Sequence, residues 1–292
     1  MSLLKVIVLA IVQGLAELLP VSSSAHVIVA EKLMGLDPSA PQMTLLLVML
    51  HTGTMFAVIA YFWSTWKSAY FSSKDVFRRF IVRVIWATAL TGVIGEGVKK
   101  LLEHTLLRGA PKVEIEQLFS HLEWIAPALA AVGVLILIAG IIEHRRPPTA
   151  HERSANSRLT LQQAGWIGIV QGLALPFRGF SRSGATISIG MITGTTKEDA
   201  ERFSFALAVV LTPAVVALEV LRLWKAAHLA GARIDLHASL LSSLLGMVFS
   251  FLAGLLALKW LSRWLETGRW YLFGVYCLAA SAIVYALHAN GL

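Results

Sequence analysis

The stretch that decides the fold is Ile-Val-Gln-Gly-Leu-Ala, which occupies residues 11–16 and occurs again at residues 169–174. After each copy the chain carries a proline and then a group of serines. These serines are Ser22, Ser23 and Ser24 after the first copy, and Ser181 and Ser183 after the second. The same order of features twice in one chain indicates that the protein is built from two repeats.

The repeats divide one membrane domain, residues 1–292, into two halves. We predict a first repeat over residues 1–143, a linker over residues 144–158 and a second repeat over residues 159–292. Each repeat begins with two short apolar pieces that a proline and serines interrupt, and neither piece is long enough to cross a bilayer. Interrupted segments at matching positions are typical of re-entrant helix–loop–helix hairpins whose tips meet at the membrane midplane.

The composition predicts that most of the chain lies in a membrane. Of the 292 residues, 57% are hydrophobic and only 14% are charged, and the mean hydropathy is +0.70. A soluble domain of this length needs more charge than this to cover its surface. Four stretches that could span a bilayer contain no Asp, Glu, Lys or Arg, at residues 38–66, 124–142, 236–258 and 270–292. Two weaker candidates are residues 80–102 and 203–222.

With about three spans in each repeat, an odd number, the second repeat begins on the opposite side of the membrane. We therefore predict an all-α integral membrane protein with an inverted-topology repeat, about six transmembrane helices and two re-entrant hairpins. The formal net charge is +8, and the Lys and Arg residues lie mainly in loops between the spans. Their distribution favours termini outside the cytoplasm and gives no reason to expect nucleic acid as a partner. The single Cys277 excludes an internal disulfide.

Ionisable residues at membrane depth are costly and usually functional, so the first hairpin contains the first candidates. Glu17 follows Gln13 by one helical turn, and both side chains lie on the same face of a helix. Glu17 is either a catalytic or metal-binding carboxylate or the ion-pair partner of an arginine, which would then be Arg182. His26, three residues after Ser23, is either a nucleophile or general acid–base toward phosphorus, or a packed core histidine.

The second hairpin has the composition of a phosphate-binding turn. Residues 179–186 read Gly-Phe-Ser-Arg-Ser-Gly-Ala-Thr, at the expected start of a helix. The Arg182 guanidinium, free backbone N–H groups and hydroxyls all suit phosphate oxygens there. The substrate-binding candidates from both hairpins are Gln13, Ser22, Ser181, Ser183, Thr186 and Arg178. The alternative is a glycine-rich packing turn whose Arg182 extends to the membrane interface.

Two further residues stay open between a functional and a structural role. Arg178 either adds positive potential to the site or extends to the interface. His51, which lies with Thr52 and Thr54 in the first predicted span, either lines the site or packs in the interior. A carboxylate, an arginine and hydroxyls beside a lipid-accessible cleft suit a pyrophosphate on a lipid tail. A divalent cation would allow Glu17 to face the two phosphates without repulsion.

Both motifs resemble those of the undecaprenyl pyrophosphate phosphatase family of bacterial inner membranes. Residues 13–26 read Gln-Gly-Leu-Ala-Glu-Leu-Leu-Pro-Val-Ser-Ser-Ser-Ala-His, and residues 179–186 form the second motif. The resemblance implies hydrolysis of the C55 isoprenyl pyrophosphate to the monophosphate and inorganic phosphate, which recycles the cell-wall carrier lipid. It also implies Mg²⁺ or Ca²⁺ as the cofactor and an active site that faces the periplasm. It leaves the oligomeric state open, with a homodimer as one option.

The resemblance also assigns roles to individual residues. The implied catalytic residues are Glu17, Ser23, His26 and Arg182, and the implied metal ligands are Glu17 and Gln13. Whether Ser23 or His26 is the nucleophile stays open. The family's acidic motif has two acids, but the first is Gln13 here, so Glu17 is the only carboxylate of the motif. The chain also reads Pro-Phe-Arg-Gly at residues 176–179, where the family commonly has Pro-Gly.

A second hypothesis is a lipid-phosphate transporter or flippase, because inverted repeats with broken helices are also a transporter architecture. Release of phosphate by the purified protein distinguishes the enzyme from the transporter. The expected partners are a polyprenyl pyrophosphate lipid and the membrane bilayer.

Overall fold

The computed structural model describes residues 2–36, 41–106, 121–146, 159–230, 236–266 and 269–291. In these residues all regular secondary structure is helical, which confirms the predicted all-α class. The first half contains α1 (Leu3–Leu18), α2 (Ser23–Leu33), α3 (Pro41–Tyr70), α4 (Lys74–Leu106) and α6 (Leu122–His144). The second half contains α8 (Leu161–Ala174), α9 (Arg182–Ile192), α10 (Lys197–Ala230), α11 (Leu236–Glu266) and α12 (Tyr271–Ala289). Most of the predicted linker, residues 147–158, lies outside the described residues.

Each half begins with a pair of short helices, as predicted. The helix α1 ends just before Pro20, because proline lacks the N–H group that would continue the helix. The helix α2 then starts at Ser23, and the side chain of the preceding Ser22 caps it by accepting a hydrogen bond from the Ala25 N–H. The Ser181 side chain caps α9 in the same way, through the Gly184 N–H. The proline and serine groups in the sequence therefore end one short helix and start the next.

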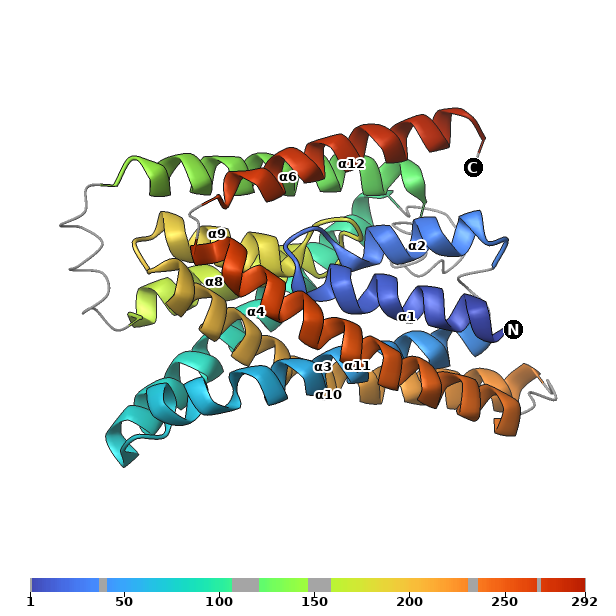
Figure 1. Cartoon of the computed structure of the whole chain (residues 1–292), viewed down its shortest axis with the longest axis horizontal. Coiled ribbons are helices and arrows are strands. Elements are labelled where there is room, and N and C mark those ends of the chain that lie inside the picture. Colours follow the sequence, from blue (N-terminus) through green and yellow to red (C-terminus); the bar gives the residue numbers. More distant parts are fainter. Residues whose placement is uncertain are drawn as a thin grey trace.

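The two hairpins enter the molecule from opposite ends, and their tips meet in the middle (Figure 1). The open end of each hairpin is closed by a hydrogen bond from its first helix to the C-cap carbonyl of its second. In the first hairpin Lys5 donates to the Met34 carbonyl at 2.7 Å. In the second, Gln163 donates to the Thr193 carbonyl at 3.1 Å. The two hairpins thus share their closing contact as well as their sequence motif.

The glycine of the repeated hexapeptide makes the same helix crossing in both halves. At Gly14 on α1, a Cβ atom would lie 2.7 Å from the Ser250 carbonyl oxygen of α11. At Gly172 on α8, a Cβ atom would lie 2.7 Å from the Thr91 carbonyl oxygen of α4. Only glycine permits two helix backbones to approach this closely, which is a common mode of packing in membranes. Each hairpin is thus held by a long helix of the other half, because α1 packs on α11 and α8 packs on α4.

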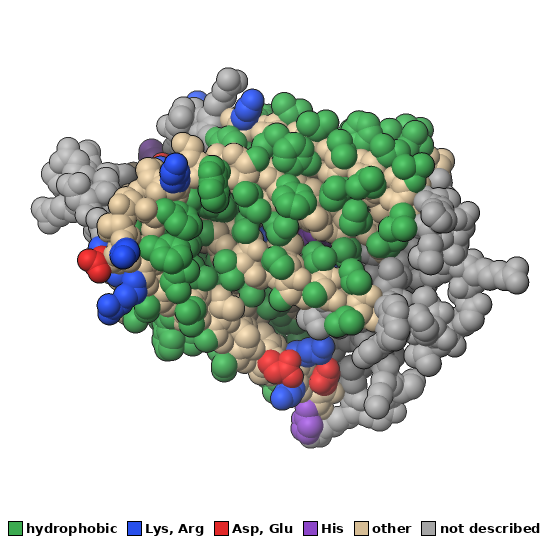
Figure 2. Space-filling view, turned by 90° about the horizontal axis from the view of Figure 1, so that it is seen from below, with side chains coloured by type: hydrophobic (Ala, Val, Ile, Leu, Met, Phe, Trp, Pro, Cys, Tyr) green, Lys and Arg blue, Asp and Glu red, His purple; other side chains and the backbone are tan. Residues whose placement is uncertain are grey.

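Within the described residues, five helices are long and apolar enough to cross a membrane. Their spans are Leu45–Tyr70, Lys74–Thr105, Leu122–His144, Leu240–Leu261 and Tyr271–Ala289. These spans match all the predicted ones except residues 203–222. Those residues lie within α10, an unbroken helix of 34 residues, whose length of about 50 Å also exceeds the bilayer core. Hydrophobic side chains cover the face seen in Figure 2, and charged side chains gather at its margins, as expected of a lipid-facing surface.

The direction of the chain reverses between the two hairpins. Three long helices, α3, α4 and α6, separate the first hairpin from the second. As a result, the start of α1 and the end of α12 lie at one end of the molecule, and the end of α6 lies at the other (Figure 1). Inverted-topology repeats predict this arrangement, whereas the division into residues 1–143 and 159–292 stays a prediction.

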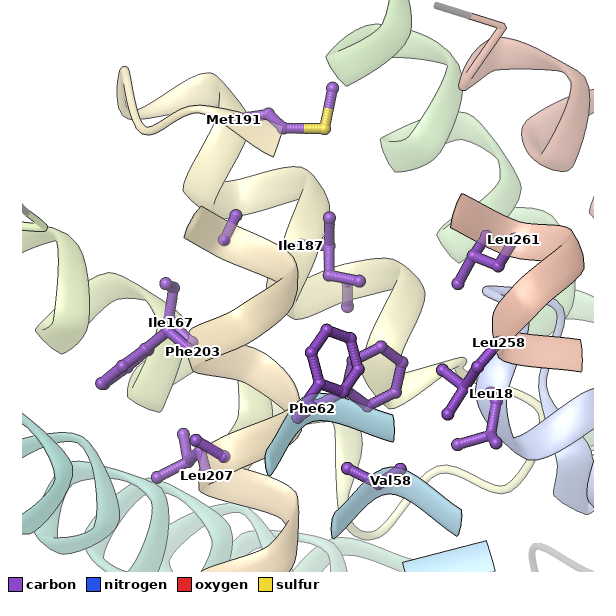
Figure 3. Close-up of a cluster of buried hydrophobic side chains, with 14 of the residues drawn as sticks. Leu18, Val58, Phe62, Ile167, Ile187, Met191, Phe203, Leu207, Leu258 and Leu261 are labelled. Carbon is purple, nitrogen blue, oxygen red and sulfur yellow. The ribbon is translucent and has the colours of Figure 1, made fainter. Parts of the chain in front are cut away.

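The hydrophobic core lies between the two halves, where the hairpin helices meet the long helices (Figure 3). Phe62 of α3 packs against Phe205 of α10, with ring centroids 5.4 Å apart. Leu18 of α1 and Ile187 of α9 belong to the same cluster of buried side chains. Because both halves supply this core, it fixes the two hairpin tips relative to one another.

Candidate active site

Glu17 and Arg182 meet where the two hairpin tips face each other. Glu17 lies near the end of α1, and Arg182 is the first residue of α9. Arg182 Nη2 donates a hydrogen bond to Glu17 Oε1 at 2.8 Å. The tips are also joined by a hydrogen bond from the Gly179 N–H to Ser24 Oγ at 3.1 Å. The structure therefore brings together the acid and the arginine that the sequence analysis singled out in separate halves.

The second oxygen of Glu17 is surrounded by three further side chains. Ser23 Oγ donates to Glu17 Oε2 at 2.5 Å, and Gln13 Nε2 donates to the same oxygen at 3.0 Å. His51 Nε2 on α3 lies 3.7 Å from it. Ser23 reaches Glu17 because the backbone turns sharply at Ser22, where φ is 70°. A positive φ is uncommon for residues other than glycine and marks a turn that the surrounding structure enforces.

One terminal nitrogen of the Arg182 guanidinium makes no hydrogen bond with the described residues. The Glu17–Arg182 pair is largely shielded, since 14% of the Glu17 side chain and 25% of the Arg182 side chain are exposed. While Nη2 bonds Glu17, Nη1 is buried without a hydrogen-bond partner in the described part of the chain. A buried donor without a partner costs free energy, so this nitrogen favours binding of an oxygen that the described residues do not supply. A phosphoryl oxygen fits, because guanidinium groups bind phosphate through paired N–H donors.

The hydroxyls of the second motif hold the turn that carries Arg182. Ser181 caps α9, and Ser183 Oγ donates to the Leu19 carbonyl of the first hairpin at 3.4 Å. Thr186 Oγ1 donates to the Arg182 carbonyl at 2.8 Å. All three hydroxyl side chains are buried. Their contacts with substrate stay predictions, but these bonds explain how the arginine is positioned.

His26 lies one turn beyond Ser23 but faces different partners. Its Nδ1 lies 2.7 Å from the Ser22 carbonyl oxygen, and its Nε2 lies 2.7 Å from the Tyr276 hydroxyl of α12. Both ring nitrogens are therefore engaged away from Glu17. Sequence reasoning missed Tyr276, because a tyrosine in an apolar helix resembles a membrane anchor. The available signal was its position inside the last span rather than at one end.

The structure also locates His51 and Arg178, whose roles the sequence left open between function and packing. His51 lies beside Glu17, so of its two alternatives the lining role fits. Arg178 lies within electrostatic range of Glu31 on α2. Glu31 is fully buried, and neither carboxylate oxygen has a hydrogen-bond partner among the described residues. The sequence analysis missed Glu31, because only the fold brings α2 beside residues 176–179.

The protein offers few ligands for a divalent cation at this site. Mg²⁺ and Ca²⁺ take about six to eight oxygen ligands. The predicted ligands are the Glu17 carboxylate and the Gln13 amide, and the described residues contain no group of three His, Cys, Asp or Glu side chains placed for a metal. These residues would therefore supply only a small part of such a coordination shell, and oxygens from water or substrate would have to complete it.

The class of protein follows from two opposed hairpins of short helices whose tips shield a carboxylate–arginine pair. The molecule is a helical integral membrane protein with a largely shielded carboxylate–arginine pair where two hairpins meet. The chain belongs to the family described as bacitracin resistance protein BacA, which matches residues 6–283. The match includes both hairpins and confirms the resemblance inferred from their motifs.

Curated relatives cover nearly the whole chain. A protein named undecaprenyl-diphosphatase 2 from Acinetobacter baylyi is 56% identical over 289 residues, which is 98% of each chain. A protein of the same name from Burkholderia ambifaria is 35% identical over 96% of this chain and 95% of its own. The undecaprenyl-diphosphatase 1 of Burkholderia pseudomallei is 34% identical over the same shares of the two chains. The similarity therefore extends over all the helices described above.

Proposed function

We propose that this protein hydrolyses undecaprenyl pyrophosphate to undecaprenyl phosphate and inorganic phosphate. The names of its relatives supply the substrate, and they favour hydrolysis over the transporter hypothesis. The observation that carries the proposal is the buried Arg182 Nη1, which has no hydrogen-bond partner in the described residues. The Nη2 of the same guanidinium bonds the carboxylate that accepts from Ser23, so an anion bound by Arg182 lies in the same site as a hydroxyl and its base.

Ser23 is the proposed nucleophile. Its Oγ donates to Glu17 at 2.5 Å, which is the geometry of a hydroxyl held by its general base. When Oγ attacks the terminal phosphorus, Glu17 takes its proton and the bond from phosphorus to the bridging oxygen breaks. The lipid monophosphate leaves as a weakly basic anion and needs no proton to do so. Water then attacks the phosphoserine and the bond from phosphorus to Ser23 Oγ breaks. Glu17 returns its proton to Oγ and accepts one proton from the water, and the remaining hydroxyl of the water leaves on the inorganic phosphate.

His26 is the less suitable nucleophile in this geometry. A nucleophilic imidazole needs a free lone pair on the attacking nitrogen, but the Tyr276 hydroxyl occupies Nε2 and the Ser22 carbonyl engages Nδ1. Attack by His26 would require both the loss of the Tyr276 contact and a movement of the ring. Ser23 can attack without any such rearrangement, so we propose that Ser23 accepts the phosphoryl group.

Arg182 is the proposed binding group for the terminal phosphate. Its planar guanidinium can bond Glu17 through one nitrogen and a phosphoryl oxygen through the other. A donor fixed where negative charge develops stabilises the transition state of phosphoryl transfer. Gln13, Ser22, Ser181, Ser183, Thr186 and Arg178 complete the proposed substrate-binding set.

The proposal includes Mg²⁺ or Ca²⁺ bound with the substrate. Glu17 and Gln13 would hold the cation, which would neutralise part of the pyrophosphate charge. The proposed location is the bacterial inner membrane, with the site open to the periplasm. The bias of Lys and Arg among the loops supports that orientation.

Release of inorganic phosphate tests the proposed function directly. Purified wild-type protein in detergent should release phosphate from undecaprenyl pyrophosphate, with a divalent cation present. Glu17→Gln keeps the shape of the side chain but removes its charge, and it serves as the inactive control. Folding of both proteins is checked by their thermal transitions. Equal phosphate release from folded wild-type and folded Glu17→Gln protein would contradict the proposal.

A further inference from the structure

The two hydrogen bonds of His26 fix the tautomer of its ring. A carbonyl oxygen only accepts hydrogen bonds, so the nitrogen facing the Ser22 carbonyl, Nδ1, carries a proton. The ring is half-buried, which favours its neutral form. In the neutral Nδ1–H tautomer, Nε2 has a lone pair, and the Tyr276 hydroxyl donates to it at 2.7 Å. The Tyr276 hydroxyl therefore stabilises the Nδ1–H tautomer of His26 over the Nε2–H tautomer.

The rings of Tyr276 and His26 also lie nearly parallel, with centroids 5.7 Å apart and an angle of 12° between their planes. The neighbouring residue on α12, Cys277, contacts the same hairpin tip, since its Sγ lies 3.5 Å from the Pro20 carbonyl oxygen. Two adjacent residues of the last helix thus contact both sides of the turn between α1 and α2.

The hydrogen bonds from Tyr276 to His26 and from His26 to the Ser22 carbonyl connect α12 to the proposed nucleophile, Ser23, through the backbone. The Ser22 carbonyl that accepts from His26 belongs to the residue with the positive φ, and Ser23 follows it directly. The orientation of that peptide group decides where the Ser23 hydroxyl points. A hydrogen bond on the carbonyl therefore helps to keep Ser23 Oγ within 2.5 Å of Glu17.

We infer that Tyr276 is a positioning residue of the active site, which acts through His26 on the Ser22–Ser23 turn. The inference rests on the proposed function and adds to it a group from α12, the last helix of the chain. Tyr276 needs no contact with the substrate to act in this way. Its hydroxyl matters because it holds the imidazole in the tautomer that donates to Ser22.

The first test is kinetic and uses Tyr276→Phe, which keeps the aromatic ring beside His26 and removes only the hydroxyl. We expect kcat to fall about tenfold, the effect of losing one hydrogen bond that orders the reacting group, while KM stays within about twofold. The matched control is Tyr285→Phe, the same change on the same helix, where the side chain is 65% exposed. The control should keep wild-type kcat and KM. An unchanged kcat in Tyr276→Phe, or an equal loss in the control, would overturn the inference.

The second test does not depend on activity. Protein labelled with ¹⁵N-histidine should show His26 as the neutral Nδ1–H tautomer, and its signals are identified by their loss in His26→Gln. Tyr276→Phe should move the Nε2 signal, because that nitrogen loses its donor, whereas Tyr285→Phe should leave it in place. An Nε2 signal unchanged by Tyr276→Phe would overturn the inference. If wild-type protein releases no phosphate, the proposed function fails, but this spectrum still decides whether Tyr276 fixes His26.

Discussion

The Glu17 carboxylate collects side chains from four different helices. Its partners are Gln13 of α1, Ser23 of α2, His51 of α3 and Arg182 of α9. Spacing along one helix links only Gln13 to Glu17, since the other three partners lie on other helices and α9 lies in the other half of the chain. The Glu17 carboxylate is therefore the group around which the fold assembles residues that are distant in sequence.

Arg182→Lys should lose activity although the charge is kept. An arginine can bond Glu17 through Nη2 and a phosphoryl oxygen through Nη1, whereas an ammonium is one compact charge that cannot span both positions. We expect kcat/KM to fall by about two orders of magnitude, the usual effect of losing one fixed donor to the transition state. The measurement is kcat/KM on protein with a wild-type thermal transition. A value near wild type would remove Arg182 from phosphate recognition.

Ser23→Ala and His26→Gln should differ in severity. If Ser23 forms the phosphoryl intermediate, its loss should lower kcat by about three orders of magnitude or more. In His26→Gln the new side chain would still offer an amide donor to the Ser22 carbonyl, so we expect this change to cost only about tenfold. Single-turnover phosphate release from both variants measures the difference. The reverse order of severity would identify His26 as the nucleophile.

Removal of divalent cations should stop turnover. Glu17 is the only carboxylate of its motif, and without a cation it would face the charged pyrophosphate directly. We expect excess EDTA to lower phosphate release by about a hundredfold, and added Mg²⁺ or Ca²⁺ to restore it. Undiminished release in EDTA would mean that Arg182 and Arg178 balance the substrate charge alone.

At the level of helices, the crossing of α1 over α11 sets the position of the first hairpin. A Cβ at Gly14 would lie 2.7 Å from the Ser250 carbonyl oxygen, so Gly14→Ala must push the two helices apart. Overpacking of this kind costs about 1–3 kcal/mol, and we expect a thermal transition lowered by several degrees. Gly92→Ala on α4 is the matched control, because no atom lies within 4 Å of its added Cβ. Equal transitions for the two variants would show that the crossing tolerates a methyl group.

The sequence predicts the short helices better than the contacts between them. The hairpins follow from proline and serine groups that act locally, through a missing N–H and a side-chain cap. Glu31 and Tyr276 were missed because their importance depends on helices that are distant in sequence. His51 was ambiguous for the same reason, since only the packing of α3 beside α1 brings it to Glu17. Local signals fix helix ends, whereas tertiary packing decides which side chains meet.

For the whole molecule, the orientation in the membrane is the property to test. The start of α1 and the end of α12 lie at one end of the molecule and the end of α6 lies at the other (Figure 1). A reporter fused after residue 292 should therefore read outside the cytoplasm, and one inserted at residue 150 should read inside, in line with the Lys and Arg distribution. Alkaline phosphatase and green fluorescent protein fusions give opposite signals on the two sides. The same signal at both positions would contradict the inverted topology.

The exchange of partners between the halves has a consequence for biosynthesis. The hairpin with Glu17 leaves the ribosome well before α11, the helix that it packs against. Gly14 lacks the α11 backbone that it contacts, and His26 lacks the Tyr276 hydroxyl, until α11 and α12 have been translated. Incomplete products of translation thus carry all the residues of the first motif but lack the surfaces that assemble them. We therefore expect synthesis that stops before α11 and α12 to yield an inactive chain rather than a partly active one.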